Sequence, residues 1–231
     1  MSRLIFIETA TSLCSTALAE DGHIVCSRRS SEPRAHASLT AVFVKEMLDE
    51  AGWTVRDLDA VCVSKGPGSY TGLRVGVSTA KGLCFGGNLP LIAVDTLELL
   101  SRQAIEAGLP DGCKAILPMV DARRMEVYTA AFSPPGERLT DISPVVLDES
   151  SFADLFAAGP VAVIGDAAEK ASTILCHSGR SEGTFVQCCP EASAMLAPAM
   201  AKYAKKEFED VAYFEPFHLK QFIATTPKKL F

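Results

Sequence analysis

The chain has 231 residues, of which 48% are hydrophobic and 22% are charged, which is typical of a globular protein with a substantial core. Its formal net charge is −6 and no run of Lys or Arg exceeds two residues, so the chain lacks the basic surface of a protein that grips nucleic acid by itself. No apolar run approaches the roughly 20 residues that cross a bilayer, and the N-terminus resembles a first strand rather than a signal peptide, which predicts a cytoplasmic protein.

The first hundred residues predict the order β-β-β-α-β-α-β, a mixed sheet with helices against it. Asp21 and Gly22 form a tight turn between two of the opening strands, which are expected to pair antiparallel. An amphipathic helix ends at Gly52, and a second helix follows the glycine-rich turn that begins at Gly66. The predicted strands are residues 4–7, 14–19, 24–27, 58–63 and 91–94.

Beyond this region the predicted elements are fewer and further apart. Pro134, Pro135 and Gly136 interrupt the pattern. We expect two lobes, residues 1–104 and 105–231, and the last segment can pack back on the first lobe. The predicted helices are residues 98–107, 152–157 and 192–204, and the predicted strands are residues 115–120, 126–132 and 161–164.

Small residues recur every fourth position in the second predicted helix, at Gly72, Gly76 and Ala80. Each interior glycine costs about 1 kcal/mol relative to alanine, so a close contact is expected to compensate. Such a stripe lets another backbone approach. That backbone can belong to the same molecule, to a second copy or to a different protein.

Two turns have the residue types of a phosphate site. Gly66, Gly68 and Gly72 lie between a strand and a helix, and Asp95 ends the next strand, which resembles a dinucleotide-binding pattern with a spacing one residue too long. The turn at residues 8–12, Glu-Thr-Ala-Thr-Ser, is typical of an actin-like kinase lobe or, as readily, of a plain β-turn.

Other candidate chemistry is incomplete. His36 has Thr40 four residues on, so the histidine pair of a zinc site is absent and a capping or surface role is predicted. Asp121, Arg123 and Glu126 surround a turn between strands, where charges are usually solvated or paired. Eight cysteines without a Cys-x-x-Cys spacing predict reduced core thiols. No complete active site emerges from these residues.

Four stretches together are similar to one family. Residues 66–76 read GPGSYTGLRVG, residues 7–11 read IETAT, residues 121–128 contain DAR and EVY, and residues 215–220 read EPFHLK. In order and spacing they resemble the TsaB (YeaZ) family, a non-catalytic subunit of the bacterial machinery that makes tRNA threonylcarbamoyladenosine. The resemblance implies an α/β protein with the actin-like ATPase (ASKHA) fold, in which each of two lobes has a mixed sheet flanked by helices.

The resemblance also implies partners. In this family the subunit pairs with the catalytic relative TsaD and with the ATPase TsaE, while TsaC supplies threonylcarbamoyl-adenylate for tRNAs that read ANN codons. A homodimer is expected when the partner is absent, and tRNA is expected to be bound only through the complex. No firm cofactor is implied, apart from weak ATP or ADP at a subunit interface. The candidate phosphate-facing residues are Glu8, Thr9 and Thr11, with Glu8 where many relatives have Asp.

The catalytic relative carries a metal-binding His-x-x-x-His, and the corresponding positions here are Thr96 and Leu100. Neither side chain replaces an imidazole ligand, so a pseudoenzyme without a metal is expected. The alternatives are an ATP-dependent phosphotransferase of the sugar-kinase type and an NAD(P)-binding oxidoreductase. The resemblance predicts a helical seam with the partner that consists of Leu39, Val42, Phe43, Met47, Gly72, Leu73, Gly76, Val77 and Ala80.

Overall fold

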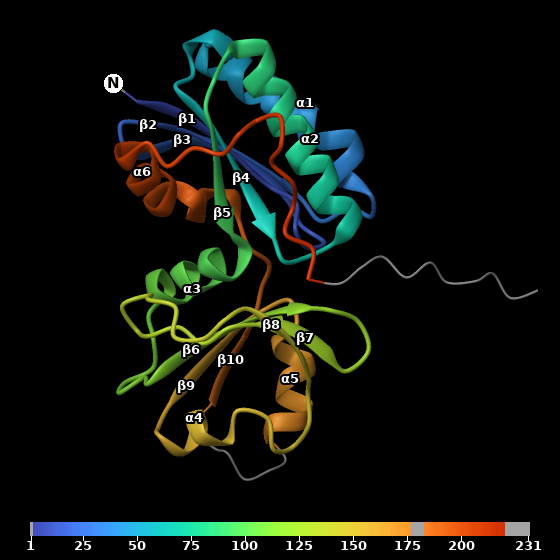
Figure 1. Ribbon diagram of the computed structural model, residues 1–231, viewed down its shortest axis with the longest axis vertical. Helices are drawn as coiled ribbons and strands as arrows, with labels where there is room; N and C mark the ends of the chain where they lie inside the picture. Colours follow the sequence, from blue (N-terminus) through green and yellow to red (C-terminus); the bar gives the residue numbers. More distant parts are fainter. Residues whose placement is uncertain (1, 177–182, 220–231) are drawn as a thin grey trace, which may run out of the picture.

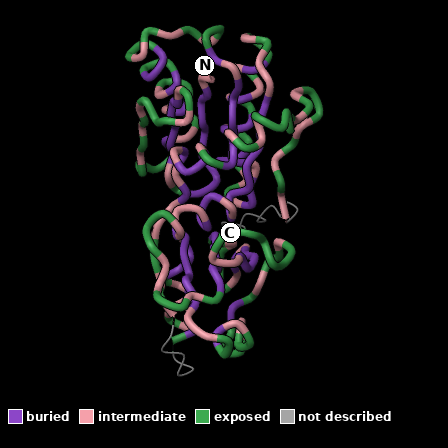
Figure 2. The backbone as a smooth tube through the Cα atoms, turned by 90° about the vertical axis from the view of Figure 1, so that its left-hand side faces the viewer, coloured by how far each residue is buried: buried purple, intermediate pink, exposed green. Residues whose placement is uncertain are grey.

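The computed structural model describes residues 2–176 and 183–219. Two lobes are stacked along the long axis of the molecule (Figure 1), and each is built on a five-stranded mixed sheet. The buried residues gather on the inner strands of both lobes, whereas the outer loops are exposed (Figure 2). Among the described residues, no helix is both long enough and apolar enough to cross a membrane.

The first sheet has the strand order β3-β2-β1-β4-β5. As predicted, the first three strands pair antiparallel, and β4 and β5 continue the sheet in parallel with β1. The central strand β1 is buried on both faces because helices cover both sides of the sheet. The strands are β1 (Arg3–Glu8), β2 (Cys14–Glu20), β3 (His23–Ser30), β4 (Ala60–Gly66) and β5 (Leu91–Asp95).

Side chains alternate between the two faces of β1. Ile5 and Ile7 pack under the helices α1 (Ala35–Ala51) and α2 (Tyr70–Gly87). Leu4 and Phe6 face the opposite side, where they meet the short helix η3 (Ala192–Met195) and helix α6 (Leu196–Lys205). The last part of the chain therefore returns to the first lobe and completes its core (Figure 1).

After α6 the chain crosses the first lobe as an extended strap without regular secondary structure (Figure 1). The Glu209 N–H donates to the Leu91 carbonyl at 2.8 Å, and the Phe217 N–H donates to the Lys65 carbonyl at 2.7 Å. Between these points the Lys81 ammonium donates to the carbonyls of Ala212 and Phe214 at 3.0 and 3.1 Å. These contacts fix the strap along β4, β5 and α2.

The second sheet has the order β10-β9-β6-β7-β8, with β6, β9 and β10 parallel. The sequence did not predict β8, α5 or β10. Two of these elements are short and half-exposed, and α5 has only eight residues, so their hydrophobic patterns are weak. The elements are β6 (Ala115–Asp121), β7 (Glu126–Thr129), β8 (Ser143–Val146), α4 (Ala153–Ala157), β9 (Val161–Gly165), α5 (Ala168–Leu175) and β10 (Gly183–Gln187).

Helix α3 (Thr96–Ala107) connects the two lobes. Leu99 belongs to the core of the first sheet, whereas Leu97, Leu100 and Ala104 belong to a cluster with the second sheet. The predicted boundary at residue 105 falls in the last turn of this helix. Because α3 contributes to both cores, each lobe depends on it.

Candidate functional site

The turn after β1 rests on the beginning of α2. The Ala10 carbonyl accepts a hydrogen bond from the Ser69 N–H at 2.7 Å, and the Ser69 side chain caps α2 by accepting from the Gly72 N–H at 3.3 Å. A Cβ at Gly72 would lie 2.1 Å from the Thr9 carbonyl oxygen, and one at Gly68 would lie 2.3 Å from the Ala10 carbonyl oxygen. The glycines are needed because the backbone of the turn occupies the space of their missing side chains.

The glycine stripe is therefore covered from within the molecule. Gly72 and Gly76 are buried, and a Cβ at Gly76 would lie 2.2 Å from the Thr9 hydroxyl. Of the three possible neighbours that the sequence left open, the structure gives the first, a segment of the same chain. Because Gly72 and Gly76 are buried in the folded lobe, they are not open to another molecule there, and the predicted contact of this stripe with a partner stays a prediction. The predicted seam residues that are buried in the lobe are Met47, Gly72, Leu73, Gly76, Val77 and Ala80.

Three predicted seam residues remain accessible on α1. Val42 is 43% exposed, and Leu39 and Phe43 are half-buried. On α2 the sequence analysis missed Phe85, which is 89% exposed near the end of the helix. An exposed phenylalanine is the kind of signal that only the three-dimensional arrangement reveals, because helical spacing alone does not say which face of α2 points outward.

Glu8 is fully buried at the end of β1. Its Oε1 accepts a hydrogen bond from the Ala10 N–H at 2.5 Å, while its Oε2 has no partner among the described residues. Burial raises the pKa of Glu8 to about 7, although the N–H of Ala10 and the Ser64 hydroxyl act in the opposite direction. Near neutral pH this carboxyl is therefore partly protonated in the folded chain.

The three candidate phosphate-facing residues do not converge on one space. The Thr9 hydroxyl is directed at Gly76 inside the lobe, whereas Thr11 lines a cleft of about 560 Å³. Both hydroxyls are buried without a hydrogen-bond partner in the described part of the chain. Glu8 is not among the residues that line the cleft.

His36 also lines this cleft, and its Nε2 is buried without a partner among the described residues. Of the two predicted roles, capping or surface, the structure does not give capping, because Arg34 in a left-handed conformation occupies the N-cap position of α1. His36 is half-buried at the second position of this helix, as the surface alternative allows.

The opposite wall of the cleft comes from the second lobe, with Asp121, Arg123 and Asp166. Asp166 accepts a hydrogen bond from the Asp121 N–H at 2.8 Å, and burial raises the pKa of Asp166 to about 6. The Lys170 ammonium donates to Asp121 Oδ1 at 2.5 Å and to the Glu126 carbonyl at 2.7 Å. The interpretation of paired turn charges is confirmed for Asp121.

Thr96 and Leu100, at the positions where the resemblance places two histidines, are buried in α3. The Thr96 hydroxyl shares a 2.8 Å hydrogen bond with the Ser64 hydroxyl. Within residues 2–176 and 183–219, no group of three His, Cys, Asp or Glu side chains is arranged to hold a metal ion. A hydroxyl and a hydrocarbon side chain therefore occupy these two positions.

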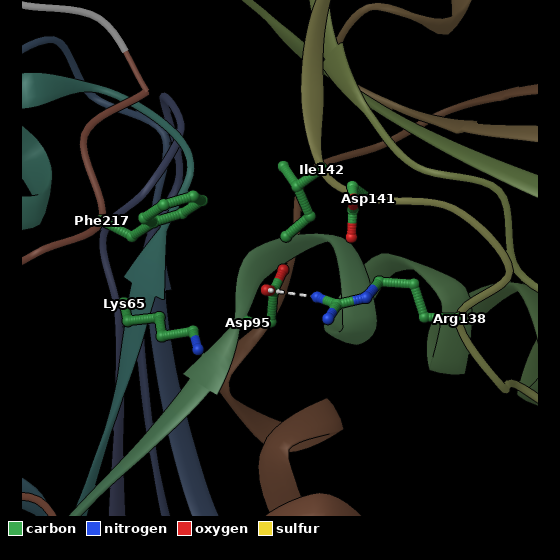
Figure 3. Close-up of a pocket in the computed structure, with 6 residues that line it drawn as sticks. All are labelled: Lys65, Asp95, Arg138, Asp141, Ile142 and Phe217. Carbon is green, nitrogen blue, oxygen red and sulfur yellow. Dashed lines mark ion pairs between the residues drawn. The ribbon is translucent and has the colours of Figure 1, made fainter.

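A second, charged cleft lies at the ends of β4 and β5, and the sequence analysis missed most of it (Figure 3). Asp95, the acidic residue of the dinucleotide-binding pattern, caps α3 by accepting a hydrogen bond from the Leu97 N–H at 3.0 Å, and it pairs with Arg138 at 3.8 Å. Since the Ala10 carbonyl fills the space at Gly68, phosphate cannot approach that glycine as the pattern requires.

Comparison with known proteins gives the family. The family model described as "TsaD: tRNA N6-adenosine threonylcarbamoyltransferase" matches residues 26–221. A TsaB protein of Escherichia coli, a "tRNA threonylcarbamoyladenosine biosynthesis protein", is 37% identical over 130 residues, or 56% of this chain and 54% of the relative. The TsaB protein of Bacillus subtilis is 30% identical over 141 residues, which is 61% of this chain and 59% of the relative. The chain thus spans little more than half the length of these curated relatives.

Solved structures extend the likeness to nearly the whole chain. YeaZ from Pseudomonas aeruginosa has a TM-score of 0.79 and 26% identity, covering 94% of this chain and 99% of that chain. An inorganic polyphosphate/ATP-glucomannokinase from Arthrobacter has a TM-score of 0.51 with 10% identity, covering 89% of this chain and 100% of that chain, so it shows the fold alone. This likeness confirms the predicted actin-like fold. The extended family-model match and the curated relatives together show that the chain belongs to the TsaB (YeaZ) family.

Proposed function

We propose that this chain is a non-catalytic subunit of the complex that makes threonylcarbamoyladenosine in tRNA, and that it binds and activates a TsaD-type transferase. The observation that carries the proposal is membership of the TsaB (YeaZ) family. The buried Thr96 and Leu100 at the positions of the metal ligands support the non-catalytic role, since neither is a metal ligand of the usual kind.

The acidic character of the chain is consistent with this division of labour. Because its net charge is −6, the chain attracts the phosphate groups of RNA weakly, so we propose that the partner makes most of the contacts with tRNA. The substrate position of the complex is the adenosine next to the anticodon in tRNAs that read ANN codons. A TsaE-type ATPase is the proposed third component, and such a complex acts in the cytoplasm.

The outer faces of α1 and α2 are the proposed partner surface. This surface is defined by Leu39, Val42 and Phe43 on α1 and by Phe85 on α2, which are apolar residues that remain at least partly accessible. Two helices that lie side by side on one sheet can pack against two helices of a homologous partner. The same face would allow a homodimer when the partner is absent.

Substitution of Val42 by aspartate tests this surface. Because Val42 is 43% exposed, the variant is expected to fold, but a buried charge at the interface should weaken capture of the TsaD-type subunit about tenfold or more. Binding is measured by titration of the purified partner, and folding is checked by circular dichroism.

Val146→Asp is the matched control, since Val146 is 66% exposed on β8 of the other lobe and should bind like the parent chain. If Val42→Asp and Val146→Asp bind the partner equally well, α1 is not part of the interface.

A nucleotide-dependent phosphotransferase is the alternative that the actin-like fold allows. The position of Glu8 argues against tight binding of Mg-ATP, because this carboxyl is fully buried and is not among the residues that line the cleft, whereas a carboxylate that ligates Mg²⁺ has to reach the ion. We expect the isolated chain to give no saturable heat with micromolar Mg-ATP in isothermal titration. If the chain bound Mg-ATP tightly and saturably and also transferred phosphate to a sugar, the kinase function would be favoured over the proposed role as a subunit. Weak ATP or ADP binding at the subunit interface is compatible with the proposal and is tested in the reconstituted complex.

A further inference from the structure

A cleft of about 300 Å³ lies between the lobes, on the charged side described above. Its walls come from four separate parts of the chain, namely the end of β4, the junction of β5 with α3, the loop between β7 and β8, and the strap. Figure 3 shows the charged side chains pointing toward a common space with two apolar side chains beside them. The lining residues are Lys65, Asp95, Arg138, Asp141, Ile142 and Phe217.

Asp95 is the anchor of this cleft. It is only 7% exposed, and its Oδ1 already accepts a hydrogen bond from the Leu97 N–H at 3.0 Å. Its Oδ2 lies 3.8 Å from the Arg138 guanidinium, which is too long for a direct hydrogen bond. Burial raises the pKa of Asp95, and the charges of Lys65 and Arg138 oppose that rise.

The other three charged side chains line the same cleft as Asp95, but none of them forms a hydrogen bond with it. Among the described residues, the side chains of Lys65, Arg138 and Asp141 make no hydrogen bond, and the only ion pair is the long one between Arg138 and Asp95. A guanidinium has five N–H donors in a fork that matches a carboxylate, and an ammonium has three. The cleft therefore offers donors and acceptors that no described protein group satisfies, and water reaches them because the Arg138 side chain is 49% exposed and Asp141 is exposed as well.

The balance of charges limits what can bind. Two cations and two carboxylates line the space, so a ligand of one sign meets two like charges as well as two opposite ones. A small molecule that carries both charges avoids this penalty if each end faces its opposite. Ile142 and Phe217 give the remaining wall an apolar character that suits a hydrocarbon side chain.

We propose that this cleft binds a free α-amino acid with an apolar side chain. The ligand carboxylate lies against Arg138 and Lys65, its ammonium lies between Asp95 and Asp141, and its side chain packs on Ile142 and Phe217. Because both lobes and the strap contribute walls, the ligand links them and stabilises the folded chain. This site is separate from the proposed partner surface on α1 and α2, so the two proposals can fail independently.

Three compounds of similar size test separately whether the carboxylate and the ammonium of the ligand are needed for binding. L-leucine carries both, L-leucinamide lacks the carboxylate, and 4-methylpentanoate lacks the ammonium. We expect millimolar L-leucine to raise the melting temperature of the full chain and to bind in isothermal titration, with the amide and the acid each weaker by about tenfold or more. Equal binding of all three, tighter binding of inorganic phosphate, or no binding of L-leucine would overturn the assignment.

Two variants test the residues. Arg138→Gln removes the fork, and Asp95→Asn removes the charge while keeping an oxygen that can cap α3. Each is expected to weaken L-leucine binding by about tenfold or more. Arg56→Gln, an exposed arginine on the 3-10 helix η1 (Val55–Asp57), is the matched control and should bind like the parent. Unchanged binding in Arg138→Gln, with the same circular dichroism as the parent, rules out this site.

Discussion

A Gly72→Ala variant is expected to lose about 3 kcal/mol or more of its free energy of unfolding. The added Cβ would lie 2.1 Å from the Thr9 carbonyl oxygen, which is backbone and cannot rotate away as a side chain would. Either the turn after β1 or the beginning of α2 has to move, and each contains a buried apolar residue, Ala10 in the turn and Leu73 in the helix. Since a domain of this kind has only about 5–15 kcal/mol in total, the loss is large.

The measurement is urea unfolding followed by the fluorescence of Trp53, the one tryptophan of the chain, which packs against the core beneath α1 and α2. Gly82→Ala is the matched control on the same helix, since a Cβ there meets no atom within 4 Å. That variant should be neutral or more stable by up to about 1 kcal/mol. Equal stability of the two variants would show that the contact between Thr9 and Gly72 is not tight.

The second large effect is a dependence of stability on pH that Glu8→Gln removes. The folded-state pKa of Glu8 is about 7 against an ordinary 4.5, so between these values the folded chain binds more protons than the unfolded chain. Its contribution to stability is fully present below about pH 4.5 and is lost as the pH rises to about 7. The stability of Glu8→Gln relative to the parent should therefore increase by about 1.4 kcal/mol per pH unit across this window, about 3 kcal/mol in total.

Urea unfolding at several pH values gives this difference directly. Asp166, whose pKa is also raised, is present in both proteins and so largely cancels in the comparison. The control is Gly82→Ala, which changes no titratable group, so its difference from the parent should stay flat from pH 4.5 to 7. A flat difference for Glu8→Gln as well would mean that Glu8 reaches solvent or a cation in solution.

The sequence predicted the first lobe well because its signals are local and strong. The hairpin at Asp21 and Gly22, the helix end at Gly52 and the strand before Gly66 all appear in the structure close to where the pattern placed them. These positions need a left-handed backbone or a continuous buried run, which few residue types allow. The order β-β-β-α-β-α-β follows from them.

The candidate sites were less predictable because their residues are far apart in the chain. Asp95 and Arg138 lie in different lobes, and no spacing rule connects a strand end with a loop beyond β7. The same limit applies to Lys170, which pairs with Asp121 across the second lobe. The turn at Glu8 follows the first strand, as the sequence predicted, but the residue pattern did not reveal that Glu8 and Thr9 are turned inward.

By itself, the sequence determined the family, the order of elements in the first lobe and the presence of close-approach glycines on α2. Only the tertiary structure decided what those glycines approach. A stripe of small residues indicates that another backbone packs closely against the helix. Which backbone this is depends on how the rest of the chain folds around that helix. Here the β1–β2 turn fills the space at Gly72 and Gly76, so the backbone that these glycines approach belongs to the same chain.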